Sequence, residues 1–295
     1  MPIAVVALDF DPFLHLGDRL VRLETLALAA GILVAFLLAA RIARGTAIGD
    51  QPGAPSGRSF RADDLVFIVL AAVPGAVVGG RLGYGLVHLD YYAGHPAALL
   101  DPGHGSLQLG LAVVGGALSG ACATRLLGER AGGWLDVAAL PLLVAIAAGK
   151  VAMALGGSGQ GLPTDAPWAT SYLGAGPWGS LAPELPSHPA QLYEAGATLL
   201  VLVGAVGLIA SGEFGRRDGR LFLAVLAAWA VARAIVAATW RDPPVVGPLR
   251  ADQLVSIGIA AGCVLLLLAS GAERHTAGDR LPEFHPPDPE TPAGL

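Results

Sequence analysis

Seven long apolar stretches constrain the fold of this chain more than any other feature of its sequence. They cover residues 25–43, 65–88, 107–127, 134–155, 190–211, 220–240 and 250–270. A membrane-spanning helix needs about 20 mostly apolar residues, and each stretch meets that length. The stretches are apolar all round, whereas the helices of a soluble protein would carry a polar face. We therefore predict an all-α, polytopic membrane protein with seven transmembrane helices.

Charged residues are scarce, which supports this fold class and argues against others. They make up 14% of the 295 residues, against roughly 25% in typical soluble domains. The 18 basic residues do not outnumber the 23 acidic ones, so no nucleic-acid partner is predicted. Two cysteines exclude a disulfide scaffold, and the histidines lack the spacing of a zinc site. We predict no metal ion and no cofactor.

The basic residues also predict an orientation, because cytoplasmic loops carry an excess of Lys and Arg. Eleven arginines lie between the first and second, third and fourth, and fifth and sixth spans or in the tail, and four lie on the other side. The eleven are Arg41, Arg44, Arg58, Arg61, Arg125, Arg130, Arg216, Arg217, Arg220, Arg274 and Arg280, and the four are Arg19, Arg22, Arg241 and Arg250. We expect the N-terminus outside and the C-terminus in the cytoplasm.

The segments outside the spans predict three regions. Residues 1–24 carry three aspartates and no basic start, so they are expected to form an interfacial arm on the outer surface. Residues 25–270 form the seven-helix domain. Residues 271–295 are rich in Pro, Glu and Asp and are expected to be a disordered cytoplasmic tail. The Gly- and Pro-rich stretch 44–62 is expected to be a flexible loop.

Several polar side chains fall inside or at the start of spans, where a charge is costly and usually functional. Three cations lie within spans, and two polar runs open later spans: Arg81, Lys150 and Arg233, then His188, Gln191, Tyr193 and Glu194, then Asp252 and Gln253. We expect the cations and Glu194 to line one polar cavity that binds an anion, with a phosphate-bearing lipid as the abundant candidate. The alternative is that the arginines reach to the nearest interface and Glu194 only pairs with a cation.

At these residues the sequence resembles the prolipoprotein diacylglyceryl transferases. The matching motifs occur in the family order over residues 9–270, and the run at 188–195 is the closest match. In the arm and the start of the first span these are DPF (11–13) and LGDRLVRLETL (16–26). The later motifs are GGRLGY (79–84), DYYAGHP (90–96), LPTDAPWA (162–169), HPAQLYEA (188–195), DGRLF (218–222), WRDP (240–243) and ADQLVSI (251–257).

The resemblance implies an enzyme of the bacterial plasma membrane that acts in lipoprotein biosynthesis. It would move a diacylglyceryl group from phosphatidylglycerol to the lipobox cysteine of a prolipoprotein signal peptide, with these two molecules and the bilayer as partners. The implied catalytic residues are Lys150, Arg233 and His188. The implied substrate-binding residues are Lys150, Arg81, Tyr84, Gln191, Tyr193, Glu194, Arg241 and Gln253.

The chain departs from the family pattern at several polar positions. The family run GRxGNFxNxExxG aligns with residues 149–161, where Lys150 replaces an Arg. The other replacements are Met153 and Gly156 for Asn, Ser158 for Glu, Gly110 for His and Glu24 for Tyr. Arg233 and Arg241 are also one residue further apart than in the family. Two alternatives to the transferase therefore stay open: a non-catalytic paralogue that binds phospholipid or lipoprotein precursor, and a lipid transferase with another acceptor.

Overall fold

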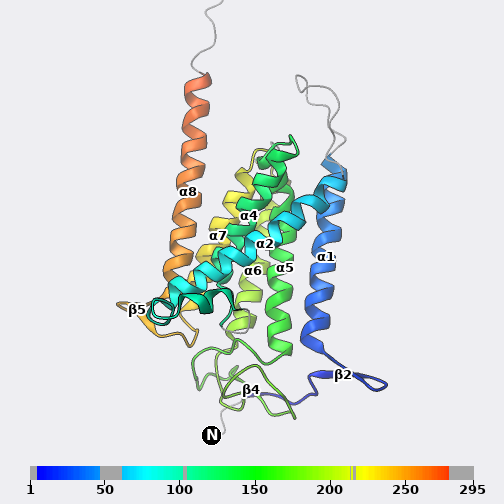
Figure 1. Ribbon diagram of the computed structural model, residues 1–295, viewed down its shortest axis with the longest axis vertical. Helices are drawn as coiled ribbons and strands as arrows, with labels where there is room; N and C mark the ends of the chain where they lie inside the picture. Colours follow the sequence, from blue (N-terminus) through cyan, green and yellow to red (C-terminus); the bar gives the residue numbers. More distant parts are fainter. Residues whose placement is uncertain (1–4, 47–61, 102–104, 213, 215–216, 279–295) are drawn as a thin grey trace, which may run out of the picture.

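Seven long helices form the body of the molecule, as expected from hydropathy. The structure, a computed structural model, describes residues 5–46, 62–101, 105–212, 214 and 217–278. Within this part, seven helices are long and apolar enough to span a membrane. They are α1 (Leu23–Thr46), α2 (Ala62–Val87), α4 (Leu109–Leu126), α5 (Ala131–Leu155), α6 (Ala190–Ala210), α7 (Arg220–Ala237) and α8 (Ala251–Gly278). Each predicted stretch lies on one of them, so the predicted seven-helix fold is confirmed (Figure 1).

Short elements gather at one end of the bundle, where α2, α5 and α7 end and α4, α6 and α8 begin. We call this end the site end; it is the lower end in Figure 1. Its helical turns are α3 (Leu89–Tyr92) and η1 (Pro96–Leu100). Its strands are β1 (Val6–Leu8), β2 (Phe13–Leu16), β3 (Arg19–Arg22), β4 (Thr170–Tyr172), β5 (Pro244–Val246) and β6 (Leu249–Arg250).

The N-terminal arm is fixed to the loop between α5 and α6 by strand pairing. β1 runs parallel to β4, with Val6 opposite Thr170 and Leu8 opposite Tyr172. β2 and β3 then form an antiparallel hairpin that leads directly into α1. Leu16 and Leu20 of this hairpin are 56% and 59% exposed. The N-terminal arm is therefore part of the site end.

Parts of three predicted segments lie outside the described residues. These parts are 47–61 of the predicted loop, 279–295 of the predicted tail and the first four residues of the arm. Among the residues used to predict the orientation, Arg58, Arg61, Arg216 and Arg280 also lie outside them. α8 continues to Gly278, beyond the start of the tail predicted from residue 271.

α2 and α4 cross in direct backbone contact, because glycines face each other where they meet. A Cβ atom on Gly79 would overlap the carbonyl oxygen of Leu111, and one on Gly115 would overlap that of Gly75. Ser119 adds a hydrogen bond from its hydroxyl to the Ala71 carbonyl oxygen, 2.9 Å away. Small residues allow such close packing in membrane helices. The glycine-rich runs of these two helices therefore serve helix packing.

α5 is tied to the start of α7 by a buried carboxylate. Asp136 is 3% exposed, and its two oxygens accept the backbone N–H groups of Gly219 and Phe222, each at 2.9 Å. These N–H groups belong to the first turn of α7, which has no intrahelical acceptor for them. Asp136 thus caps α7 from a neighbouring helix.

Replacing Asp136 with Asn is expected to lower the free energy of unfolding by about 1–3 kcal/mol, because an amide leaves one buried N–H group without an acceptor. Thermal unfolding in detergent measures the effect. Asp90→Asn makes the same chemical change at an exposed position of α3 and should leave the midpoint unchanged. An equal midpoint for both variants would contradict this role.

Candidate active site

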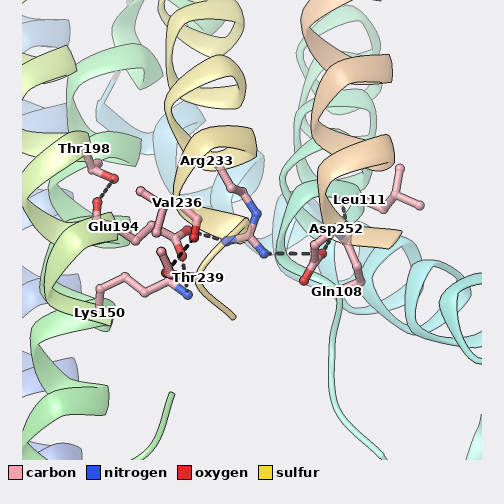
Figure 2. A network of polar contacts seen from close by, with 9 residues as sticks. All are labelled: Gln108, Leu111, Lys150, Glu194, Thr198, Arg233, Val236, Thr239 and Asp252. Atoms are coloured by element: carbon pink, nitrogen blue, oxygen red, sulfur yellow. Dashed lines mark hydrogen bonds and ion pairs between the residues drawn. The ribbon is translucent and has the colours of Figure 1, made fainter. Parts of the chain in front are cut away.

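Four charged side chains form a row across four helices near the site end (Figure 2). Lys150 of α5 lies 2.9 Å from Glu194 Oε2 of α6, measured from its Nζ atom. The other oxygen of Glu194 accepts a hydrogen bond from Arg233 Nη1 of α7. Arg233 Nη2 lies 3.4 Å from Asp252 Oδ1 of α8. The charges alternate in sign along the row, so two cations balance two carboxylates.

The first three members of the row are buried. Lys150 and Arg233 are each 5% exposed and Glu194 is 1% exposed, whereas the side chain of Asp252 is 22% exposed. Burial shows that Arg233 does not reach out to the interface, which was the alternative interpretation of the sequence. Removing charges from water is costly unless they are paired, so the direct ion pairs explain how this part of the bundle holds them.

Two tryptophans lie against the cations of the row. The Nζ atom of Lys150 lies 4.6 Å from the ring centre of Trp240, which follows α7. The guanidinium carbon of Arg233 lies 5.9 Å from the ring centre of Trp229, one turn earlier on the same helix. A cation over an aromatic face gains electrostatic stabilisation, more so when water is excluded. These contacts were not predictable from the sequence, because Trp at a helix end is also typical of membrane interfaces.

Gln108 extends the row at its exposed end. Its Nε2 donates a hydrogen bond of 2.6 Å to Asp252 Oδ1, and its Oε1 accepts the backbone N–H of Leu111 at 2.6 Å. Gln108 is therefore both the N-cap of α4 and a partner of α8. Sequence reasoning missed it, because a single Gln before an apolar stretch has no distinctive pattern.

Gln191 and Tyr172 form a second buried group beside Glu194. Gln191 Nε2 donates to the Tyr172 hydroxyl at 3.1 Å, and this hydroxyl donates to the Ala154 carbonyl oxygen at 2.8 Å. Burial raises the pKa of the Tyr172 phenol, although the hydrogen bond from Gln191 opposes the shift. The phenol thus stays protonated and keeps donating to the last turn of α5.

His188 and Tyr193 lie together at the start of α6 but in a separate cluster. The Nδ1 atom of His188 is 3.2 Å from the Tyr193 hydroxyl, which accepts a hydrogen bond of 2.7 Å from Trp168 Nε1. In the described part of the chain, no hydrogen bond or ion pair joins His188 to Lys150 or Arg233. The start of α6 therefore directs Glu194 to the buried cations, whereas His188 and Tyr193 contact the loop between α5 and α6.

The remaining predicted site residues bind backbone groups of the site end. Arg81 donates to the carbonyl oxygens of Ala98, Leu99 and Asp101 at 2.8–3.0 Å. Tyr84 lies one turn later and stacks on His88, with ring centres 4.1 Å apart.

Arg241 and Gln253 tie the region between α7 and α8 to its neighbours. Arg241 donates to the Gly161 carbonyl oxygen at 2.7 Å and to the Ser187 hydroxyl at 2.9 Å. Gln253 donates to the Ala234 carbonyl oxygen at 3.2 Å and accepts the Arg250 N–H at 2.9 Å. Arg241 thus joins segments that are far apart in the sequence, and Gln253 joins the start of α8 to the neighbouring α7, so both shape the surroundings of the row.

A comparison with known families now identifies the chain. The model of the family described as prolipoprotein diacylglyceryl transferase matches residues 12–269. The chain belongs to this family. The match covers nearly the whole segment over which the motifs resemble the family, so that prediction is confirmed.

Individual members of the family are similar over most of their length. The chain is 31% identical to the phosphatidylglycerol–prolipoprotein diacylglyceryl transferase of Rhodopseudomonas palustris, over 90% of this chain and 91% of that protein. It is 34% identical to the protein of the same name from Rhodospirillum centenum, over 80% of each chain. With its seven spans, this family member is a multi-pass protein of the bacterial plasma membrane.

Two of the departures from the family pattern lie against each other. A Cβ atom on Gly156, which ends α5, would overlap the carboxylate of Glu24 at the start of α1. Glu24 in turn lies 3.4 Å from Arg22 Nη2. The acidic side chain thus fills the space that a larger residue at 156 would take, so the two replacements are sterically coupled.

Proposed function

We propose that this chain transfers the diacylglyceryl group of phosphatidylglycerol to the thiol of the lipobox cysteine in a prolipoprotein signal peptide. The observation that carries the proposal is the pair of buried cations, Lys150 and Arg233, that converge on Glu194. Membership of the family supports it, since the similar proteins from two bacteria are named for this reaction.

The reaction needs no nucleophile from the protein. The acceptor thiolate attacks the glyceryl carbon that carries the phosphate, a sulfur–carbon bond forms, and glycerol phosphate leaves with the electrons of the broken carbon–oxygen bond. The protein must orient the lipid, stabilise the leaving phosphate and help the thiol lose its proton. These tasks call for fixed cations and a nearby proton acceptor.

Lys150 and Arg233 are proposed to bind the phosphate. Arg233 can present two N–H groups to one phosphate, whereas Lys150 acts as a point charge. Glu194 holds both side chains in place before the lipid arrives, and the phosphate competes with it for their N–H groups. The site is thus preorganised for an anion of about the size of a carboxylate or phosphate.

The other predicted site residues are proposed to shape the surroundings of this phosphate site. Arg81 and Tyr84 hold the turn after α2, which would border the lipid. Gln191 fixes the end of α5 through Tyr172, while His188 and Tyr193 expose polar groups at the start of α6. Arg241 ties the segment after α7 to the loop between α5 and α6, and Gln253 ties the start of α8 to α7.

We propose that the site end faces the outside of the cell. Three of the arginines counted for the cytoplasmic side, Arg41, Arg44 and Arg217, lie at the other end, where they line a hollow of about 740 Å³. Cytoplasmic ends of membrane helices carry an excess of Lys and Arg. The row of charges would then meet the outer leaflet and the signal peptides that emerge there.

A direct assay tests the proposed reaction. The purified protein in detergent, supplied with phosphatidylglycerol and a lipobox peptide, is expected to give a peptide heavier by one diacylglyceryl group and to release glycerol phosphate. Mass spectrometry measures both products. A peptide with Ser in place of the lipobox Cys is the control and should stay unmodified. If phosphatidylglycerol binds but no product forms, the chain is instead a non-catalytic lipid-binding protein.

A further inference from the structure

We propose that the carboxylate of Asp252 accepts the proton of the acceptor thiol, through its oxygen Oδ2. The inference rests on the proposed function, because it names the base for that reaction. It concerns a residue at the start of α8 that the sequence placed at a span boundary without a role.

The two carboxylates of the row differ in how far they are engaged. Glu194 is 1% exposed, and each of its oxygens faces a cation. Asp252 uses only Oδ1, which receives both Gln108 and Arg233, and its side chain is 22% exposed. Within the described part of the chain, no hydrogen bond or ion pair occupies Oδ2 of Asp252. Of the two, only Asp252 offers an accessible free oxygen.

Asp252 also lies at the distance that the reaction requires. Reacting atoms stand about 3–3.5 Å apart before attack, and a base lies about 2.6–3.2 Å from the atom that loses the proton. The attacked carbon is one oxygen away from the phosphorus, so the base must lie within a few ångströms of the phosphate-binding group. Asp252 lies 3.4 Å from Arg233, whereas His188 belongs to the separate Tyr193 cluster.

The surroundings hold Asp252 in one orientation. Gln108 donates to its Oδ1 and is itself held by the backbone of Leu111. A Cβ atom on Gly110 would lie 3.2 and 3.3 Å from the two amide atoms of Gln108 and 3.0 Å from Ile259 Cδ1. Position 110 therefore has little room for a side chain, and the amide that fills its surroundings points to Asp252.

Proton transfer to Asp252 would help the leaving group at the same time. The thiol proton moves to Oδ2, the sulfur electrons form the bond to the glyceryl carbon, and the phosphate leaves with the carbon–oxygen pair. A neutral Asp252 no longer competes with the phosphate for Arg233. At the same step the phosphate changes from a diester to a monoester and gains negative charge, so it binds Arg233 more strongly. The proton on Asp252 then passes to the released phosphate or to water, which completes the balance.

The test compares two acceptor peptides and variants of Asp252. Asp252→Asn is expected to lower the transfer rate to the Cys peptide by about 10²–10⁴-fold, with phosphatidylglycerol binding retained and partial rescue in Asp252→Glu. A peptide with selenocysteine should restore much of the rate of Asp252→Asn, because a selenol ionises at neutral pH without a base. The rate of this variant on the Cys peptide should also rise as the pH is raised towards the thiol pKa of about 8.5, because the thiol then ionises without a base.

The control is Asp90→Asn, an exposed carboxylate of α3 that should leave transfer unchanged. A normal rate for Asp252→Asn on the Cys peptide overturns the inference alone. An equal loss on both peptides, or a loss of lipid binding, also overturns it, since either result assigns Asp252 to the support of Arg233. If the unaltered protein transfers nothing, the proposed function fails and the inference fails with it.

Discussion

Replacing Lys150 with Ala is expected to abolish detectable transfer, with a loss of at least about 10²–10³-fold in rate. The ammonium group is one of two cations buried beside Glu194, and Lys150 is only 5% exposed, so solvent cannot supply the missing stabilisation of the phosphate charge. Without it, Arg233 alone would have to stabilise the leaving phosphate. The rate of diacylglyceryl transfer at saturating phosphatidylglycerol measures the effect.

Lys150→Arg is expected to keep or raise this rate, because a guanidinium can bind the phosphate with two parallel hydrogen bonds. The face of Trp240 beside the Nζ atom can also accept a planar guanidinium. Arg125→Ala, at the exposed opposite end of the bundle, is the control and should transfer normally. A strong loss in Lys150→Arg would mean that the packing around this position accepts only the smaller cation.

Replacing Glu194 with Gln is expected to destabilise the fold by about 3–5 kcal/mol, because it leaves two buried cations without their shared carboxylate. Lys150 and Arg233 both depend on this one side chain for their closest charge partner. Thermal or denaturant unfolding in detergent measures the change. Glu184→Gln alters an exposed carboxylate of the loop before α6 and should leave the stability unchanged.

An anion should rescue the Glu194→Gln variant if the cations form a phosphate site. Glycerol phosphate or phosphatidylglycerol is expected to raise the unfolding midpoint of the variant more than that of the unaltered protein, since ligand that binds only the folded state stabilises it. An equal shift in both proteins would show that the anion does not bind where the Glu194 carboxylate lay.

Hydropathy predicted the helices well because a bilayer imposes a length on every apolar span. The row of charges was also predictable in part, since the cost of an unpaired charge in a membrane requires Lys150, Arg233 and Glu194 to find partners. The order in which these residues pair could not be predicted, because it depends on which helices are neighbours. Arg233 meets Asp252 only because α7 packs against α8.

The partners of Arg81 and Arg241 were not predicted, although both were predicted as site residues. Arg81 and Arg241 bind carbonyl oxygens that any sequence would provide. The strand pair of β1 and β4 escaped prediction for a related reason, because three residues are too few to show a period of two. Gln108 acts through its place at a helix start, which composition does not reveal.

The alternation of charge in the row has a consequence for how the protein enters the membrane. Its members appear along the chain as Lys150, Glu194, Arg233 and Asp252, one on each of four successive long helices, with signs that alternate. Insertion of a charged side chain costs a few kcal/mol, on the order of 2.5–3.5 at a helix centre. Each of the first three of these helices is therefore followed during synthesis by one that carries its counter-charge. The same contacts that hold the finished site thus let the growing chain neutralise itself step by step.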